Sequence, residues 1–181
     1  MWPWDSIAAE CEFLGESGVD WVLTSPPQEH ITGAAWWTVY QPVSYKIESR
    51  FGTREQFANM VATCSEQGVD VLADAVINHM TAQTSGTGYA GTKFTKYEYE
   101  GLYTREDFHN CNLTPDDSIS SYKDLAQVQT CELLALSDLN QKLENVQNQI
   151  LTYLNDLLSL GVAGFRIDAA KHMAASDLKV K

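Results

Sequence analysis

The sequence has few basic residues, no long apolar run and no phosphate-binding glycine motif. Lysine and arginine total 12 against 24 aspartates and glutamates, for a formal net charge of −12, which argues against a nucleic-acid partner. No apolar stretch approaches a membrane span, so we expect no membrane partner. The start, MWPWDSIAAE, has neither the basic nor the apolar region of a signal peptide. GxGxxG and GxxxxGK[ST] are also missing, which argues against a nucleotide site.

Cysteine is scarce as well, and its spacing carries little information. None of the four cysteines forms a CxxC pair, which argues against a zinc knuckle. Two arrangements stay open, two disulfides or four buried thiols, and we favour the disulfides. The four positions are Cys11, Cys64, Cys111 and Cys131.

A repeated pattern organises the 181 residues, whose hydrophobic share of 44% is typical of a globular domain. ESGVDWVLTS, EQGVDVLADA and SLGVAGFRID each contain the end of a helix, a Gly-Val pair and a strand. Glycine suits the position after a helix because φ is often positive there. We expect strands at 19–25, 69–77 and 162–168, and helix–strand repeats of this kind indicate a parallel α/β sheet. The repeat alone fits both an open doubly wound sheet and a closed (β/α)₈ barrel.

The helices before these strands show start signals and apolar stripes. Thr53 and Gln56 fit a capping box for the second helix. We expect the first helix to begin at a cap on Asp5 or Ser6. The stripe of the second helix, at helical spacing, consists of Phe57, Met60, Val61 and Cys64.

An insertion follows the second strand. Gly18 and Gly68 lie 50 residues apart, whereas Gly68 and Gly161 lie 93 apart. The excess, roughly residues 80–137, is rich in Gly, Thr, Ser, Tyr and Asn, which predicts irregular or short-stranded structure. Insertions at the carboxyl end of a strand are where α/β folds place binding loops.

Polar side chains gather where the predicted strands end. GVAGFRIDAAKH places Arg166 and Asp168 on one face of a strand, and burying charge is costly unless it is paired or functional. ADAVINHM adds Asn78 and His79 at the end of the preceding strand. Since the carboxyl ends of parallel strands share one rim, we expect these groups to meet there.

Plainer interpretations of the same residues stay open. Arg166 and Asp168 also fit a buried structural ion pair, and Asn78 and His79 fit a turn followed by a core histidine. The Trp36–Trp37 pair also fits core packing. Asp138 also fits a cap for a helix that begins near Gln141.

Four motifs resemble the α-amylase family of retaining glycoside hydrolases, specifically the animal and actinobacterial-type enzymes. DAVINH is similar to the motif at the end of barrel strand three, and GFRIDAAKH to the motif at strand four. LSDLN resembles the short motif near the end of the inserted domain, except for Ser137, where an apolar or small residue is usual. PPQEH…WWTVYQPVSY resembles the loop that forms the sugar-binding cleft. The motifs occur in the family's order and cover essentially the whole chain.

The resemblance implies a partial (β/α)₈ barrel in residues 1–79 and 138–181, with an inserted domain at 80–137. The family's proton donor follows strand five and a further aspartate follows strand seven, so we expect both to be missing. The chain is then a fragment of a longer amylase, or a natural truncated protein that binds glucan or calcium without hydrolysis. An unrelated α/β scaffold is the third alternative.

The resemblance implies endo-hydrolysis of α-1,4-glucans with retention of configuration. Asp168 matches the nucleophile, Arg166 the cation that keeps this carboxylate ionised, and His79 a histidine that bonds sugar hydroxyls. Retaining glycosidases also need a proton donor, so we expect negligible activity from the isolated chain. The implied substrate-binding residues are Trp36, Trp37, Tyr40, Gln41, Tyr122, Leu136, Lys171 and His172.

The resemblance also implies inorganic ligands. The side chains of Asn78 and Asp138 match calcium ligands, as do the backbone carbonyls of Gln129 and His172, and oxygen donors of this kind suit Ca²⁺. In chloride-dependent members the arginine that Arg166 matches also contacts the anion.

For the cysteines we predict that Cys11 pairs with Cys64 and ties two neighbouring helices together. Cys111 is predicted to pair with Cys131 and to staple the inserted domain. The parent enzyme is expected to be a secreted monomer whose partner is an α-glucan.

Overall fold

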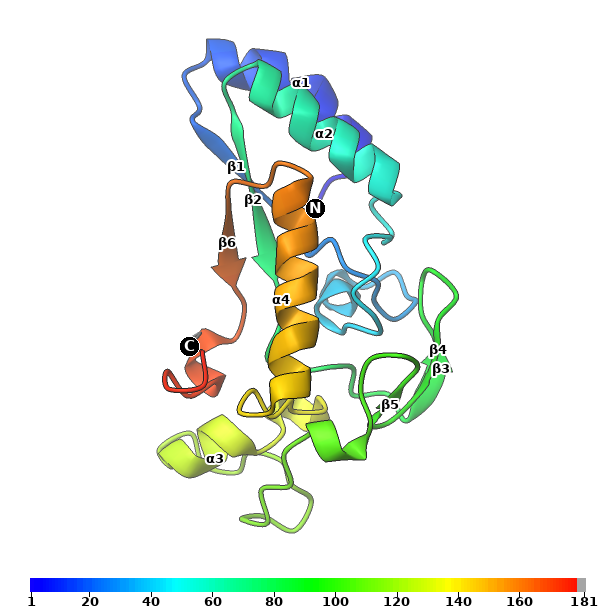
Figure 1. Ribbon diagram of the computed structural model, residues 1–181, viewed down its shortest axis with the longest axis vertical. Helices are drawn as coiled ribbons and strands as arrows, with labels where there is room; N and C mark the ends of the chain where they lie inside the picture. The colour runs from blue at the N-terminus through cyan, green and yellow to red at the C-terminus, as the bar shows by residue number, and fades with distance from the viewer. Residues whose placement is uncertain (179–181) are drawn as a thin grey trace.

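Three parallel strands form the centre of the computed structural model, which describes residues 1–178, so the last three residues of the predicted barrel segment 138–181 lie outside the described residues. They are β1 (Trp21–Thr24), β2 (Asp70–Ala75) and β6 (Gly164–Ile167), hydrogen-bonded in the order β1-β2-β6. All three run the same way (Figure 1). The three predicted parallel strands are confirmed, each somewhat shorter than expected.

A helix precedes each strand of this sheet. They are α1 (Trp4–Glu16), α2 (Arg54–Glu66) and α4 (Glu144–Ser159). Figure 1 shows α1 and α2 side by side, while α4 runs along the sheet against the strand direction. The glycine after each helix has a positive φ, from 72° to 96°, as expected for a residue that reverses the chain after a helix.

The predicted helix starts are partly confirmed. Thr53 and Gln56 form the capping box of α2. The cap predicted for α1 is wrong because Pro3, whose ring presets φ near −60°, takes the N-cap position. Asp5 lies instead in the first turn, where a negative charge favours the helix dipole, and accepts a hydrogen bond from Gln56.

The hydrophobic core has two parts. One lies between the helices and the parallel sheet, around Trp4, Phe57 and Leu157, which are fully buried. The other lies under the inserted segment, around Met80 and Leu139.

The first predicted disulfide staples the helical layer of this core. It joins Cys11 of α1 to Cys64 of α2, with their Cα atoms 4.8 Å apart. The predicted pairing of Cys11 with Cys64 is therefore confirmed.

The inserted segment lies at the carboxyl ends of the parallel strands (Figure 1). Its three short strands pair only with one another, in an antiparallel sheet, and so do not extend the parallel sheet. The prediction of irregular or short-stranded structure is confirmed, whereas the bounds 80–137 stay a prediction. The remaining elements are β3 (Ser85–Thr87), β4 (Lys93–Thr95), β5 (Glu98–Tyr99), α3 (Leu125–Thr130) and the 3₁₀ helices η1 (Trp36–Tyr40), η2 (Arg105–Asp107), η3 (Leu133–Ala135) and η4 (Ala170–His172).

Candidate active site

Charged side chains at the ends of β2 and β6 are joined by hydrogen bonds. The register sets Asp74 directly opposite Arg166, so their side chains emerge on the same face. Arg166 Nη1 donates to both carboxylate oxygens of Asp74, at 2.8 and 2.7 Å, and to Asp168 Oδ1 at 3.0 Å. Tyr40 donates its hydroxyl to Asp74 Oδ2 at 2.8 Å. The predicted contact between Arg166 and Asp168 is therefore present, and Asp74 joins it.

The burial of these groups differs. Asp74 is only 3% exposed, while the side chains of Asp168 and Arg166 are 18% and 47% exposed. The hydrogen bond to Asp74 raises the pKa of Arg166 above the usual value of an arginine. Burial, together with donation to Asp74, raises the pKa of Tyr40. At neutral pH an ionised guanidinium therefore lies beside Asp168, and a carboxylate in that position is electrostatically stabilised.

A cleft of about 440 Å³ opens over this network. Trp36 and Trp37 are 65% and 48% exposed at its edge, so the interpretation of this pair as core packing is wrong. Exposed aromatic rings beside a polar floor suit the apolar faces of sugar rings. The cleft is lined by Trp36, Trp37, Tyr40, Gln41, His79, Leu133, Leu134, Leu136, Arg166 and Asp168. A larger hollow of about 1060 Å³, between the 44–46 segment and α4, is lined by none of the candidate catalytic, substrate-binding or metal-binding residues predicted from the sequence.

Two leucines of the lining were not predicted. Leu133 and Leu134 belong to η3 and face the cleft together with Leu136. Leu134 is 78% exposed and has a left-handed φ of 53°. Their signal in the sequence was the apolar stretch that directly precedes the LSDLN motif.

His79 lines the cleft but both of its ring nitrogens have partners. Nε2 lies 3.0 Å from the carbonyl oxygen of Tyr40, and Nδ1 lies 3.2 Å from the side-chain nitrogen of Asn78. Burial lowers the pKa of His79, which keeps the ring neutral. The neutral tautomer that fits both partners carries its proton on Nε2 and accepts on Nδ1.

Tyr122, Lys171 and His172 gather outside the cleft lining, where α3 meets η4. The Lys171 ammonium lies 5.2 Å from the Tyr122 ring centre, and the ring of His172 lies 6.3 Å from it. His172 Nδ1 is 2.9 Å from the carbonyl oxygen of Val128, which joins η4 to the inserted segment. Burial lowers the pKa of His172.

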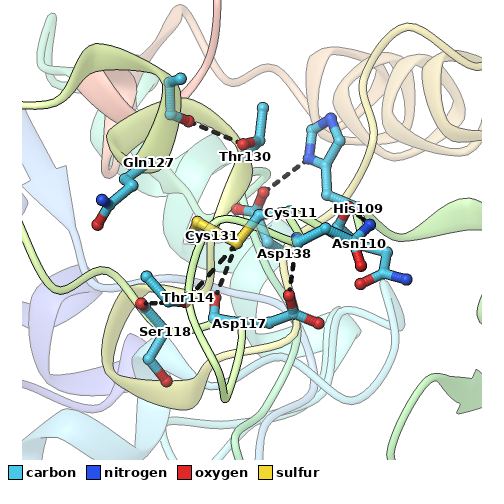
Figure 2. The surroundings of a disulfide bond; sticks show 12 residues. His109, Asn110, Cys111, Thr114, Asp117, Ser118, Gln127, Thr130, Cys131 and Asp138 are labelled. Atoms are coloured by element: carbon cyan, nitrogen blue, oxygen red, sulfur yellow. Dashed lines mark hydrogen bonds and ion pairs between the residues drawn. A yellow bond between two sulfur atoms is a disulfide. The ribbon is translucent and has the colours of Figure 1, made fainter.

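Two of the four predicted calcium ligands, Asn78 and Asp138, meet where the inserted segment returns to the sheet. Gln129 lies in α3 and His172 in η4. Asp138 Oδ2 lies 2.7 Å from His109 Nδ1 (Figure 2), and Asp138 Oδ1 accepts from the amide of Asn78 at 3.3 Å. Burial raises the pKa of Asp138 to about 6. Asp138 does not cap a helix, because its carboxylate faces these groups and the N-cap of α4 is Leu143.

Asn78 and Asp138 carry oxygen donors of the kind that a hard cation binds. Asn78 Oδ1 is buried and has no hydrogen-bond partner, which is costly for a polar atom unless an ion or water satisfies it. Within residues 1–178 no three His, Cys, Asp or Glu side chains cluster as a metal site. The predicted set, with one carboxylate, one amide and two carbonyls, would not form such a cluster.

The second disulfide lies beside these residues. Cys111 is joined to Cys131, with the Cα atoms 5.0 Å apart, as predicted. Figure 2 shows this bond next to His109 and Asp138, so it tethers the loop that carries His109 to the end of α3.

Comparison with known proteins identifies the family. The profile of the alpha-amylase catalytic domain matches residues 12–179. An alpha-amylase of Streptomyces violaceus is 56% identical over 98% of this chain, and one of Thermomonospora curvata is 49% identical over 99%. The structure of a variant of alpha-amylase I from Eisenia fetida in complex with maltohexaose superposes with a TM-score of 0.95, at 41% identity over 98% of this chain.

The chain therefore belongs to the alpha-amylase catalytic-domain family, and its parallel sheet is part of a (β/α)₈ barrel. The alternative of an unrelated α/β scaffold is wrong. The chain spans 30% of the length of the Streptomyces and Thermomonospora relatives and 38% of the Eisenia protein. Across the described residues, no helix has the length and apolar character that a membrane crossing requires.

Proposed function

We propose that these residues form the nucleophile-bearing part of an α-amylase that cleaves internal α-1,4-glucosidic bonds of starch- or glycogen-type glucans. The observation that carries the proposal is the contact of Arg166 with Asp168 on the floor of a cleft edged by the exposed Trp36–Trp37 pair. The arrangement combines a charge-stabilised carboxylate with a stacking surface, which is what a retaining glycosidase requires on the nucleophile side.

In the proposed reaction Asp168 attacks the anomeric carbon. A bond forms between its carboxylate oxygen and that carbon while the bond to the departing glycosidic oxygen breaks, and water later hydrolyses the glycosyl–enzyme intermediate. Arg166 donates a hydrogen bond to Asp168 Oδ1 and holds the carboxylate for the attack. His79 lies in the same cleft, and a sugar hydroxyl bonds to it by taking the place of the Tyr40 carbonyl.

The general acid is not evident among the described residues at this floor. Asp74 is the carboxylate that shares Arg166 with Asp168, but it is buried and already bound by Arg166 and Tyr40. It therefore holds the network in place and does not protonate a leaving group. Because the curated relatives are about three times as long, we propose that further polypeptide supplies the acid in the intact enzyme.

The remaining assignments follow the same proposal. Trp36 and Trp37 stack on glucose rings, while Tyr40, Gln41 and Leu136 shape the cleft around them. The residues where α3 meets η4, Tyr122, Lys171 and His172, bind the part of the glucan that leaves when the bond is cleaved. Residues 1–79 and 138–181 form the barrel part, and 80–137 form a separate inserted domain.

Calcium is proposed as a structural ligand, held by the side chains of Asn78 and Asp138 and by the carbonyls of Gln129 and His172. The unpartnered Asn78 Oδ1 supports this site. When bound, the ion would join the inserted segment to the ends of β2 and β6. Chloride is proposed as a second ion, with Arg166 as one ligand.

We further propose that the parent enzyme is a secreted monomer. Two disulfides within one short chain support an oxidising compartment.

The test uses the chain alone and a chimera in which it replaces the matching segment of the Streptomyces violaceus relative. We expect the chain to bind maltoheptaose without hydrolysing starch, and the chimera to hydrolyse starch. Asp168→Asn in the chimera should abolish hydrolysis while binding persists. Hydrolysis by the chain alone, abolished by Asp168→Asn, would show that the acid lies within these residues and would overturn this assignment.

A further inference from the structure

The stretch that carries the aromatic edge of the cleft is a loop closed at its base. It runs from the buried His30 to Arg50, and η1 with the exposed Trp36 and Trp37 lies between them. Backbone hydrogen bonds from Ile31 to Gln41 and from Val43 to Glu29 pair its two sides. The end of η1 is fastened separately, because Gln28 donates to the carbonyl of Val39 at 3.1 Å.

His30 and Arg50 join the two ends of this loop. His30 is fully buried, and its Nδ1 donates to the carbonyl of Ile31 at 2.7 Å. A neutral imidazole has one donor and one acceptor nitrogen, so Nε2 is the acceptor. It accepts the backbone N–H of Arg50 at 3.2 Å.

The Arg50 side chain continues from this junction to the start of η1. Its Nη1 donates to the carbonyls of Ala34 and Ala35, both at 3.1 Å. Ala35 is the N-cap of η1, and Gly33, just before these residues, has a φ of 145° that favours glycine. The chain therefore enters η1 directly after a glycine with a positive φ, and the hydrogen bonds from Arg50 fix the position of the two residues that follow.

We propose that His30 and Arg50 form a clasp that positions the Trp36–Trp37 stacking surface for glucan, and that protonation of His30 opens the clasp. The inference rests on the proposed function for the identity of the ligand. In it Arg50 and His30 are positioning residues that act through the tryptophans.

The surroundings of His30 explain why acid opens the clasp. A proton on Nε2 would face the Arg50 N–H donor, with no lone pair left to accept it. The titratable groups around the ring are Glu29, Arg50 and Tyr89. Glu29 already accepts hydrogen bonds from Ser44 and from the backbone N–H groups of residues 90 and 92, so it is not free to pair with a protonated ring.

The direction of the pH effect follows from burial. Burial is the largest influence on the pKa of His30 and lowers it below its ordinary value. The closed clasp therefore favours the neutral ring. Its contribution is complete above the ordinary histidine pKa of about 6.5 and is lost as pH falls through the lower value of the folded chain.

The first test compares Arg50→Met with the wild-type chain at pH 8. Losing both guanidinium–carbonyl bonds should raise the Kd for maltoheptaose about tenfold, which corresponds to about 1.4 kcal/mol. Arg50→Lys should lose less, because an ammonium keeps the charge but not the fork of donors. Arg54→Met is the matched control, since it removes an arginine of α2 whose partner is Asp156. It should leave the Kd unchanged.

The second test measures pH dependence with His30→Gln, which keeps an acceptor for Arg50 but does not titrate. Wild-type affinity should fall between pH 8 and pH 5 by more than that of the variant. Buried His79 contributes a pH dependence that both proteins share. Equal pH profiles in the two proteins would overturn the acid-opening part of the proposal.

Hydrogen exchange separates failure of the clasp from failure of the proposed function. At pH 8, Arg50→Met should increase exchange in 31–49 while α1 and α2 exchange as in the wild type, which also shows that the variant folds. If the wild type binds no maltoheptaose, the proposed ligand is wrong, yet the exchange result still tests the clasp. Unchanged exchange in 31–49 would overturn the clasp itself.

Discussion

The ion pair between Asp74 and Arg166 should couple the two strands at the floor of the cleft by about 2 kcal/mol. Breaking a buried pair costs about 3–5 kcal/mol, whereas exposed pairs contribute about 0.2–1 kcal/mol. Here the Asp74 side chain is 4% exposed and that of Arg166 is 47% exposed. We therefore expect a value between the two ranges, because solvent screens the guanidinium from one side.

A double-mutant cycle measures this coupling without assigning the whole cost of either substitution to the pair. The free energy of unfolding in urea is compared for the wild type, Asp74→Asn, Arg166→Met and the double variant. The pair between Arg54 and Asp156 is the matched control, because its side chains are 41% and 38% exposed. The coupling energy between Arg54 and Asp156, measured by the same cycle, should be less than about 1 kcal/mol.

Arg166→Met alone should cost more than Asp74→Asn, because it leaves the buried Asp74 carboxylate without its cation. Asp74→Asn leaves the half-exposed Arg166 paired with Asp168, and the asparagine oxygen still accepts from Tyr40. A coupling below about 0.5 kcal/mol, or one no larger than that of the control pair, would refute the reasoning, since an isolated exposed pair gives as much.

Three further changes test stability. Replacing Cys11 and Cys64 together by alanine should lower the free energy of unfolding by about 4 kcal/mol, because their 53-residue separation sets the loop entropy; a loss below about 1 kcal/mol in urea melts would contradict this. Gly68→Ala should cost about 1–2 kcal/mol through its φ of 72° alone, since no atom lies within 4 Å of the added Cβ, and a neutral thermal shift would count against it. Calcium at 1,000 times its Kd should stabilise the chain by about 4 kcal/mol. EDTA should remove that gain and Asp138→Asn should be insensitive to both, so an equal calcium response in the variant would exclude Asp138 as a ligand.

Local patterns in the sequence were sufficient for the helix–strand framework. The capping box at Thr53 and Gln56 and the glycine that follows each helix depend on contacts between residues a few positions apart. The local order of residues favours such contacts before distant segments pack. The cap of α1 was missed because proline also satisfies an N-cap, and its fixed φ outweighed the side-chain oxygens of Asp5 and Ser6.

Local sequence patterns predicted only part of the candidate site. The sequence by itself determined that Arg166 and Asp168 share one face of a strand, because side chains alternate along the backbone. Only the tertiary structure decided that Asp74 stands opposite Arg166 and that Arg50 reaches the carbonyls of Ala34 and Ala35. The register between strands and the closure of a loop depend on how distant segments pack, and no short stretch of sequence encodes that packing.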